Sequence, residues 1–119
     1  MRAILIKPDA VGHKHVEVVE YDGDYRSIYN LISWSEREVT TFDCVMIDDS
    51  HTMFVDDEGL LYAPKHFMVW DGYDQPIAGR GLILGTDEYG DSVACELNEE
   101  WVREQVTIMD IARVVEVFG

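Results

Sequence analysis

The sequence has no apolar run long enough to cross a membrane. Its apolar stretches are strand-sized, as in Ala3-Ile4-Leu5-Ile6, whereas a membrane-spanning helix needs ~18 apolar residues. Near the N-terminus, Lys7-Pro8-Asp9 interrupts the first stretch, so we expect no secretory signal region there. We therefore expect a soluble, cytoplasmic protein with no membrane partner.

Cysteine is scarce. Cys44 and Cys95 are the only two, and neither belongs to a Cys-x-x-Cys pair, which excludes a zinc-ribbon or dithiol redox motif. In an intracellular protein both thiols are expected to be reduced and buried as core residues. Their spacing alone leaves a disulfide between them open.

Basic residues are also few. Nine Lys and Arg stand against 24 Asp and Glu, which gives a formal net charge of −15. Such a surface repels nucleic acid and anionic membranes, so we expect no direct contact with either. It attracts basic protein surfaces, most strongly at low salt. The same charge is also compatible with a role in solubility alone.

Catalytic motifs are absent as well. There is no Gly-x-Ser-x-Gly nucleophile elbow and no Cys–His pairing that the sequence supports. Gly79-Arg80-Gly81 precedes a predicted strand and not a helix, so it is a poor phosphate-binding loop. We expect no catalytic residue, no cofactor and no enzymatic activity.

Two groups of residues are candidate metal ligands, and neither fits a known pattern. The first lies in two turns: Asp48, Asp49, His51, Asp56, Asp57 and Glu58. It lacks the alternating acids of a calcium loop, and Asp is common in turns because it bonds its own backbone. His13 and His15 would share one face of a strand, with His66 elsewhere, but no paired ligand motif brings them together. We expect no metal site.

What the sequence does contain is an alternation of short strands and helices. At 119 residues and 47% hydrophobic content, it predicts one compact acidic domain spanning residues 1–119. Strands are predicted at 2–7, 15–20, 42–47, 52–55, 80–86 and 91–95. Helices are predicted behind the capping residues Asp24 and Asn98. Residues 110–118 fit either a helix capped by Asp110 or a final strand. The fold class is α+β, a mostly antiparallel sheet with two or three short helices packed on it.

Residues from about Ala63 to Ala78 show no clear period and contain Pro64 and Pro76, so they are interpreted as a long ordered loop. The loop is rich in aromatic residues, which are enriched in binding interfaces. The candidate binding residues are His66, Phe67, Trp70, Asp71, Tyr73, Asp74 and Arg80. Alternatively, the aromatic side chains fold back over one face of the sheet and close the core.

Several segments between Met1 and about Val106 resemble a family of small phage and mobile-element proteins, domain of unknown function 3846. The similar segments are residues 1–8, 42–48 and 55–59, a loop that contains Pro64, and, most strongly, residues 75–85. The resemblance implies a viral accessory protein that acts in the cytoplasm of the host cell. It supplies no catalytic residue.

Together these observations predict a non-enzymatic binding module that engages a host protein with a basic or aromatic-accepting surface. A module that sequesters a nucleotide or another small molecule is one alternative. An acidic DNA mimic is the other, and it would use acid pairs such as those at 48–49, 56–57, 87–88 and 99–100. The oligomeric state stays open.

Overall fold

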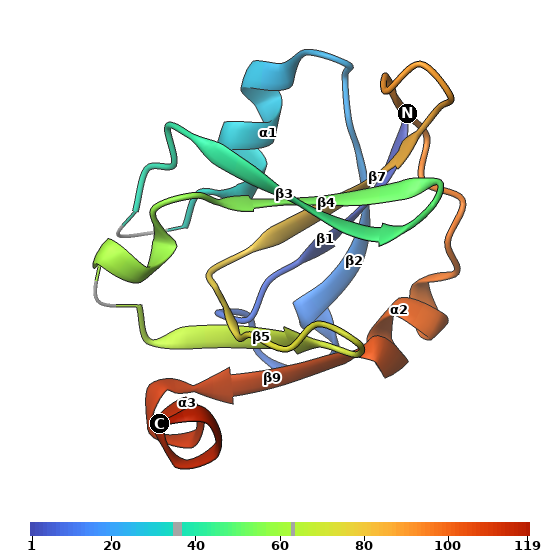
Figure 1. Cartoon of the computed structure of the whole chain (residues 1–119). Helices are drawn as coiled ribbons and strands as arrows, with labels where there is room; N and C mark the ends of the chain where they lie inside the picture. The colour runs from blue at the N-terminus through green and yellow to red at the C-terminus, as the bar shows by residue number, and fades with distance from the viewer. Residues whose placement is uncertain (35–36, 63) are drawn as a thin grey trace.

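The computed structural model describes residues 1–34, 37–62 and 64–119 and contains two stacked antiparallel sheets (Figure 1). The larger sheet has the order β2 (Val16–Glu20), β1 (Arg2–Ile6), β7 (Gly81–Thr86), β4 (His51–Asp56) and β3 (Phe42–Asp48), and β8 (Ser92–Val93) also pairs with β7. The smaller sheet has the order β6 (Ile77–Ala78), β5 (His66–Trp70) and β9 (Val106–Asp110). The helices are α1 (Tyr25–Ile32), α2 (Glu99–Gln105) and α3 (Ile111–Phe118), with 3-10 turns η1 (Gly12–His15) and η2 (Gly59–Tyr62). The predicted α+β class is confirmed.

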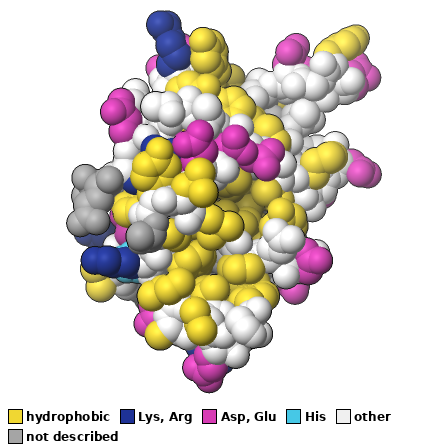
Figure 2. Space-filling model, turned by 60° about the vertical axis from the view of Figure 1, so that its left-hand side comes forward, with side chains coloured by type: hydrophobic (Ala, Val, Ile, Leu, Met, Phe, Trp, Pro, Cys, Tyr) yellow, Lys and Arg dark blue, Asp and Glu magenta, His cyan; other side chains and the backbone are white. Residues whose placement is uncertain are grey.

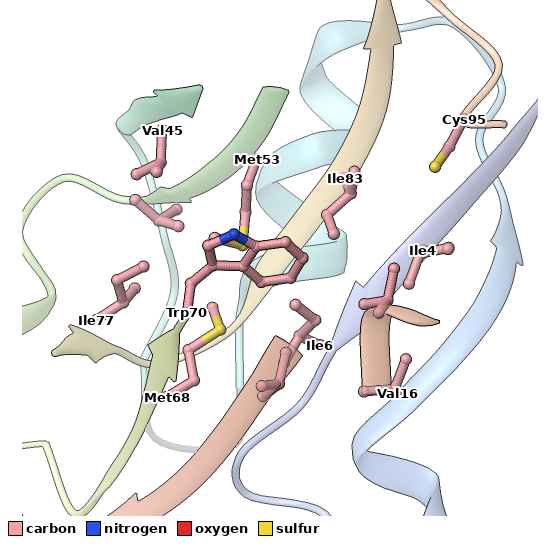
Figure 3. Close-up of a cluster of buried hydrophobic side chains, with 13 residues drawn as sticks. Ile4, Ile6, Val16, Val45, Met53, Met68, Trp70, Ile77, Ile83 and Cys95 are labelled. Atoms are coloured by element: carbon pink, nitrogen blue, oxygen red, sulfur yellow. The ribbon is translucent and has the colours of Figure 1, made fainter. Parts of the chain in front are cut away.

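The central strands of the larger sheet are buried on both faces, because α1 covers one face and the smaller sheet covers the other (Figure 1). In β1, Ala3 and Leu5 pack in the cluster with α1, whereas Ile4 and Ile6 pack between the sheets. Figure 3 shows this second cluster, in which side chains from both sheets surround Trp70. The fold is thus layered as α1, larger sheet, smaller sheet and α3.

Local capping determines where each α-helix begins. The carboxylate of Asp24 accepts the Arg26 N–H at 3.0 Å, the side chain of Asn98 accepts the Trp101 N–H at 3.1 Å, and Asp110 accepts the Arg113 N–H at 2.9 Å. The predicted helices behind Asp24 and Asn98 are confirmed. At the C-terminus the helical alternative is right, and it follows a strand, β9, that the sequence did not predict.

The prediction of a long loop from Ala63 to Ala78 is wrong at β5 and β6, which lie within that range; residue 63 lies outside the described residues. Phe67 packs on the α3 side of the smaller sheet, and Met68 and Trp70 pack between the sheets. A strand that is buried on both faces shows no alternation of polar and apolar residues, which is why its period was not visible.

Two smaller expectations also need correction. His13 and His15 belong to η1 and not to a strand, which removes the reason for placing them on one strand face. The cysteines are both free, but only Cys95 is buried, whereas Cys44 is exposed on β3. Loss of hydration around the sulfur atom nevertheless raises the pKa of both thiols, and at Cys44 the nearby carboxylate of Asp43 adds to the effect.

Across the described part of the chain, every helix is too short or too polar to cross a membrane.

Candidate functional site

A groove of about 370 Å³ opens on the face where the larger sheet, η2 and the β5–β6 turn meet. Figure 2 shows this face, with hydrophobic side chains gathered around a hollow and acidic side chains beside it. The groove is lined by Asp43, Val45, Val55, Asp56, Asp57, Glu58, Gly59, Leu60, Leu61, Tyr73, Gln75, Pro76, Ile77 and Ala78. These residues are called the acidic groove below.

The base of the acidic groove is apolar and its mouth carries exposed apolar side chains. Val45, Val55 and Ile77 are buried at the base, and the first two come from neighbouring strands of the larger sheet. At the mouth, Leu60 and Leu61 are 70% and 77% exposed. Single exposed apolar residues are common on protein surfaces, but an adjacent pair beside an apolar hollow forms a continuous patch.

The charged residues that line the acidic groove are all acidic. Asp43 and Asp57 are exposed, and Glu58 is partly exposed next to them. Among the described residues that line the groove there is no Lys, Arg or His. The groove therefore combines an apolar base with a negative rim, which favours a cationic or neutral ligand over an anionic one.

A buried ion pair holds one side of the rim in place. The Arg37 guanidinium donates to both carboxylate oxygens of Asp56, at 3.0 and 3.1 Å, and to the carbonyl oxygen of Glu38 at 2.7 Å. It also lies 3.7 Å from the centroid of the Tyr62 ring, which connects η2 to the pair. The hydrogen bonds to Asp56 raise the pKa of Arg37 above its usual value, so the guanidinium stays charged.

Close packing fixes the other side of η2. A side chain at Gly59 would place its Cβ 3.0 Å from the carbonyl oxygen of Ala78 and 3.2 Å from its Cβ, so η2 approaches β6 as closely as a glycine permits. The position of the two exposed leucines is therefore set by the Arg37–Asp56 pair on one side and by β6 on the other.

The predicted binding residues do not form one site. Phe67 and Trp70 are 2% and 5% exposed and are core residues; Trp70 lies edge-on to Trp101 with their centroids 6.0 Å apart. Of the seven predicted residues, all of them described, Tyr73 alone lines the acidic groove, and it is 37% exposed. The aromatic side chains at 67 and 70 thus follow the core alternative.

The remaining predicted residues lie at two other places. Asp71 and Asp74 are exposed in the β5–β6 turn. Arg80 forms an ion pair with Asp9, with two hydrogen bonds of 3.0 and 2.7 Å. His66 is exposed and borders a small hollow of about 10 Å³ near that pair. Hydrogen bonds from Arg80 lower the pKa of Asp9.

The acidic hairpin turn is a structural turn. The Asp48 carboxylate accepts the Ser50 N–H at 2.8 Å, and the Asp56 carboxylate accepts the Glu58 N–H at 3.0 Å, as the turn interpretation predicts. In the described parts of the chain no group of three or more His, Cys, Asp and Glu side chains is placed to hold a metal ion.

His51 is bonded through both ring nitrogens. Its Nε2 accepts the Glu96 N–H at 3.2 Å, so Nδ1 carries the proton and donates to Asp48 at 3.0 Å. Ser50 is next in sequence, but the histidine has no free nitrogen to act as its base. This Asp–His pair therefore joins the β3–β4 turn to the segment before α2.

No local sequence pattern predicts the groove, because its lining comes from separate segments between Asp43 and Ala78. One local signal was present. Leu60-Leu61-Tyr62 directly follows Asp56-Asp57-Glu58-Gly59, so an apolar pair stands beside three acids in a turn region, where apolar residues are unusual.

Comparisons with known proteins identify one matching family and similar bacterial proteins. The model of the family described as domain of unknown function (DUF3846) matches residues 1–107. An uncharacterised protein, y4iR, of Sinorhizobium fredii (strain NBRC 101917 / NGR234) is 32% identical over 85 residues, which cover 71% of this chain and 49% of the relative. Protein PsiB of Rhizobium leguminosarum bv. phaseoli is 40% identical over 43 residues, which cover 36% of this chain and 32% of the relative. No solved structure matches. The chain thus spans about half or less of these relatives.

Proposed function

The chain belongs to the DUF3846 family, and from that premise we propose that it is a non-enzymatic protein-binding module whose contact surface is the acidic groove. The observation that carries the proposal is the exposed pair Leu60 and Leu61 at the mouth of an apolar hollow. Burying a leucine side chain contributes about 1.5–3 kcal/mol, so a partner that covers both gains a substantial part of a micromolar affinity.

Tyr73 supports the same surface. It lines the same groove as η2, and tyrosine is over-represented among the residues that dominate binding energies. Its ring offers apolar area and its hydroxyl a hydrogen bond at the edge. The predicted contact at Tyr73 is therefore kept in the proposal, and Phe67 and Trp70 are not part of the contact surface.

The acidic rim and the net charge of −15 define the partner as basic. Complementary charge speeds association and selects against acidic competitors. The same rim argues against nucleotide sequestration, since a phosphate would meet carboxylates and no base among the described lining residues. A DNA mimic presents carboxylates in place of the phosphates of DNA. The apolar centre of this groove contributes nothing to such a mimic, because the contacts of a phosphate backbone are polar.

The biological setting is also part of the proposal. We place the module in the cytoplasm of a host cell, as an accessory protein of phage or mobile-element type that engages a host protein. Support for this setting is the resemblance of the sequence to such a family.

The test is affinity capture from cell lysate with the wild type and two matched variants. The groove variant carries Leu60→Ser, Leu61→Ser and Tyr73→Ala. The control carries Val11→Ser and Tyr89→Ser, whose side chains are 87% and 82% exposed and do not line the groove. We expect the control to retain the basic partners, the groove variant to lose them, and high salt to weaken capture. Full retention by the groove variant would refute the proposal.

A further inference from the structure

The acidic groove is bordered by an open sheet edge. β3 is the last strand in the order of the larger sheet, so within residues 1–34, 37–62 and 64–119 no strand pairs with the outer side of its backbone. Its side chains are largely exposed, including Asp43, Cys44 and Met46, and only Val45 is buried. Asp43 and Val45 line the groove, which brings the open edge and the apolar hollow together.

The backbone groups that face outward on β3 follow from the pairing with β4. Asp57 donates its N–H to the carbonyl oxygen of Thr41, and Phe42 lies opposite Asp56. In an antiparallel ladder the groups that bond the partner alternate along the strand. Phe42, Cys44 and Met46 therefore direct their N–H and C=O groups away from β4, toward the open edge.

We propose that the partner binds by strand addition: an extended basic segment pairs with the open edge of β3 and inserts alternate apolar side chains into the acidic groove. This inference rests on the proposed function and specifies its partner and its geometry. Such binding draws its affinity from backbone hydrogen bonds and its specificity from the pockets that receive alternate side chains.

The side-chain spacing of a strand fits the groove. Residues i and i+2 of an added strand point to the same face, about 6.8 Å apart. On the groove side they meet the base at Val45 and the exposed leucines of η2. Basic side chains that follow the apolar ones on the groove face of the same segment are close to Asp57 and Glu58 on the rim, where the described lining holds no competing cation.

Charge excludes a second copy of this chain from the edge. A pairing of β3 with β3 would bring Asp43 and Asp48 of two molecules together, each with a net charge of −15. Charged residues on an edge strand are a common means of preventing self-association. In the unbound protein the Asp43 carboxylate accepts a hydrogen bond from the outward Cys44 N–H at 2.8 Å. When the basic segment binds, its backbone carbonyl oxygen takes the place of this carboxylate.

The first experiment uses a defined probe, a labelled eight-residue peptide with valine or leucine at the central alternate positions, threonine between them, and lysine at both ends, so that the groove face of the strand carries apolar and basic side chains. Its affinity is measured by fluorescence anisotropy for the wild type and for the groove variant above. Two further peptides carry backbone N-methyl groups on the odd or on the even residues. An N-methyl group removes a hydrogen bond to β3 only on those peptide residues whose N–H faces β3, and these are every second residue. We therefore expect one series to lose at least about tenfold in affinity and the other to bind nearly unchanged.

The second experiment acts on the protein. Cys44→Pro removes an N–H on the open edge and no bond of the β3–β4 ladder, whereas Cys44→Val keeps that N–H. We expect the proline variant to bind the peptide roughly tenfold more weakly or worse, and the valine variant to bind as the wild type does. Hydrogen exchange followed by NMR is expected to show slower exchange at Phe42, Cys44 and Met46 when the peptide is bound.

The outcomes separate the two proposals. Strand addition is wrong, and the binding groove is kept, if the peptide binds and requires the groove leucines but the two N-methyl series have equal affinities and the β3 amides are not protected from exchange. If the groove variant binds the peptide as well as the wild type does, the groove itself is wrong. If the wild type does not bind the peptide, strand addition by a basic segment is rejected. Where Cys44→Pro fails to fold, the N-methyl series and the exchange data decide.

Discussion

Replacing Arg37 by methionine is expected to remove a large part of the stability of this small domain. The side chains of Arg37 and Asp56 are 6% and 1% exposed, and two hydrogen bonds join them. In Arg37→Met the Asp56 carboxylate keeps only the Glu58 N–H as a bonded partner in the described structure. Breaking a buried pair by removing one partner costs about 3–5 kcal/mol, because a charge stays buried without compensation.

The opposite change, Asp56→Asn, is expected to cost less, about 2 kcal/mol. Arg37 keeps its bond to the Glu38 carbonyl oxygen, the face of Tyr62, and the Glu58 carboxylate 3.9 Å away. The structure therefore predicts that Arg37→Met loses more unfolding free energy than Asp56→Asn. A double variant with both residues replaced by apolar ones is expected to be more stable than Arg37→Met, because it leaves no buried charge without a partner.

Urea unfolding followed by tryptophan fluorescence measures these differences at pH 7. A loss below about 1 kcal/mol in Arg37→Met, or a loss in Asp56→Asn as large as that in Arg37→Met, would refute this account of the pair.

Two further predictions concern packing and pH. In Gly81→Ala the new Cβ would lie 2.6 Å from Met68 Cε and 2.7 Å from Met53 Sδ, and both methionines are fully buried; we expect a loss of about 1–3 kcal/mol in urea unfolding, and an unchanged midpoint would contradict the close packing. Because Arg80 holds the pKa of Asp9 below its usual value of 3.8, the ion pair stabilises the fold above that pH and stops doing so as the pH falls through the lowered pKa. Asp9→Asn is thus expected to cost less than about 1 kcal/mol at pH 7 and progressively less as the pH falls below 3.8, and a difference that grows in acid would show that the pair acts otherwise.

The parts of the fold that the sequence predicts are those determined locally. α1 follows from Asp24 and from the buried positions Ile28 and Ile32, and the β3–β4 turn follows from the bonds that Asp48 makes to its own neighbours. Both depend on residues a few positions apart. β5 depends instead on α3 and on the larger sheet, which cover its two faces, and no window of sequence contains those partners.

The acidic groove was not predicted for the same reason. Val45 and Ile77 are 32 positions apart and meet at its base only after both sheets have formed. The aromatic content of residues 65–76 pointed to a nearby region, but composition does not tell which side chains turn inward. Trp70 points into the core and Tyr73, three residues later, reaches the groove.

The position of β7 has a consequence for how the chain folds. The hairpins β1–β2 and β3–β4 form between neighbouring segments. In the sheet they are joined through β7, which pairs Ile83 with Ile4 on one side and with Met53 on the other. During synthesis neither hairpin has a shared partner until residues 81–86 emerge, and closing that long loop is the slow, non-local step. A ribosome that stops before Gly81 releases two hairpins with unprotected edges, which is a state prone to aggregation.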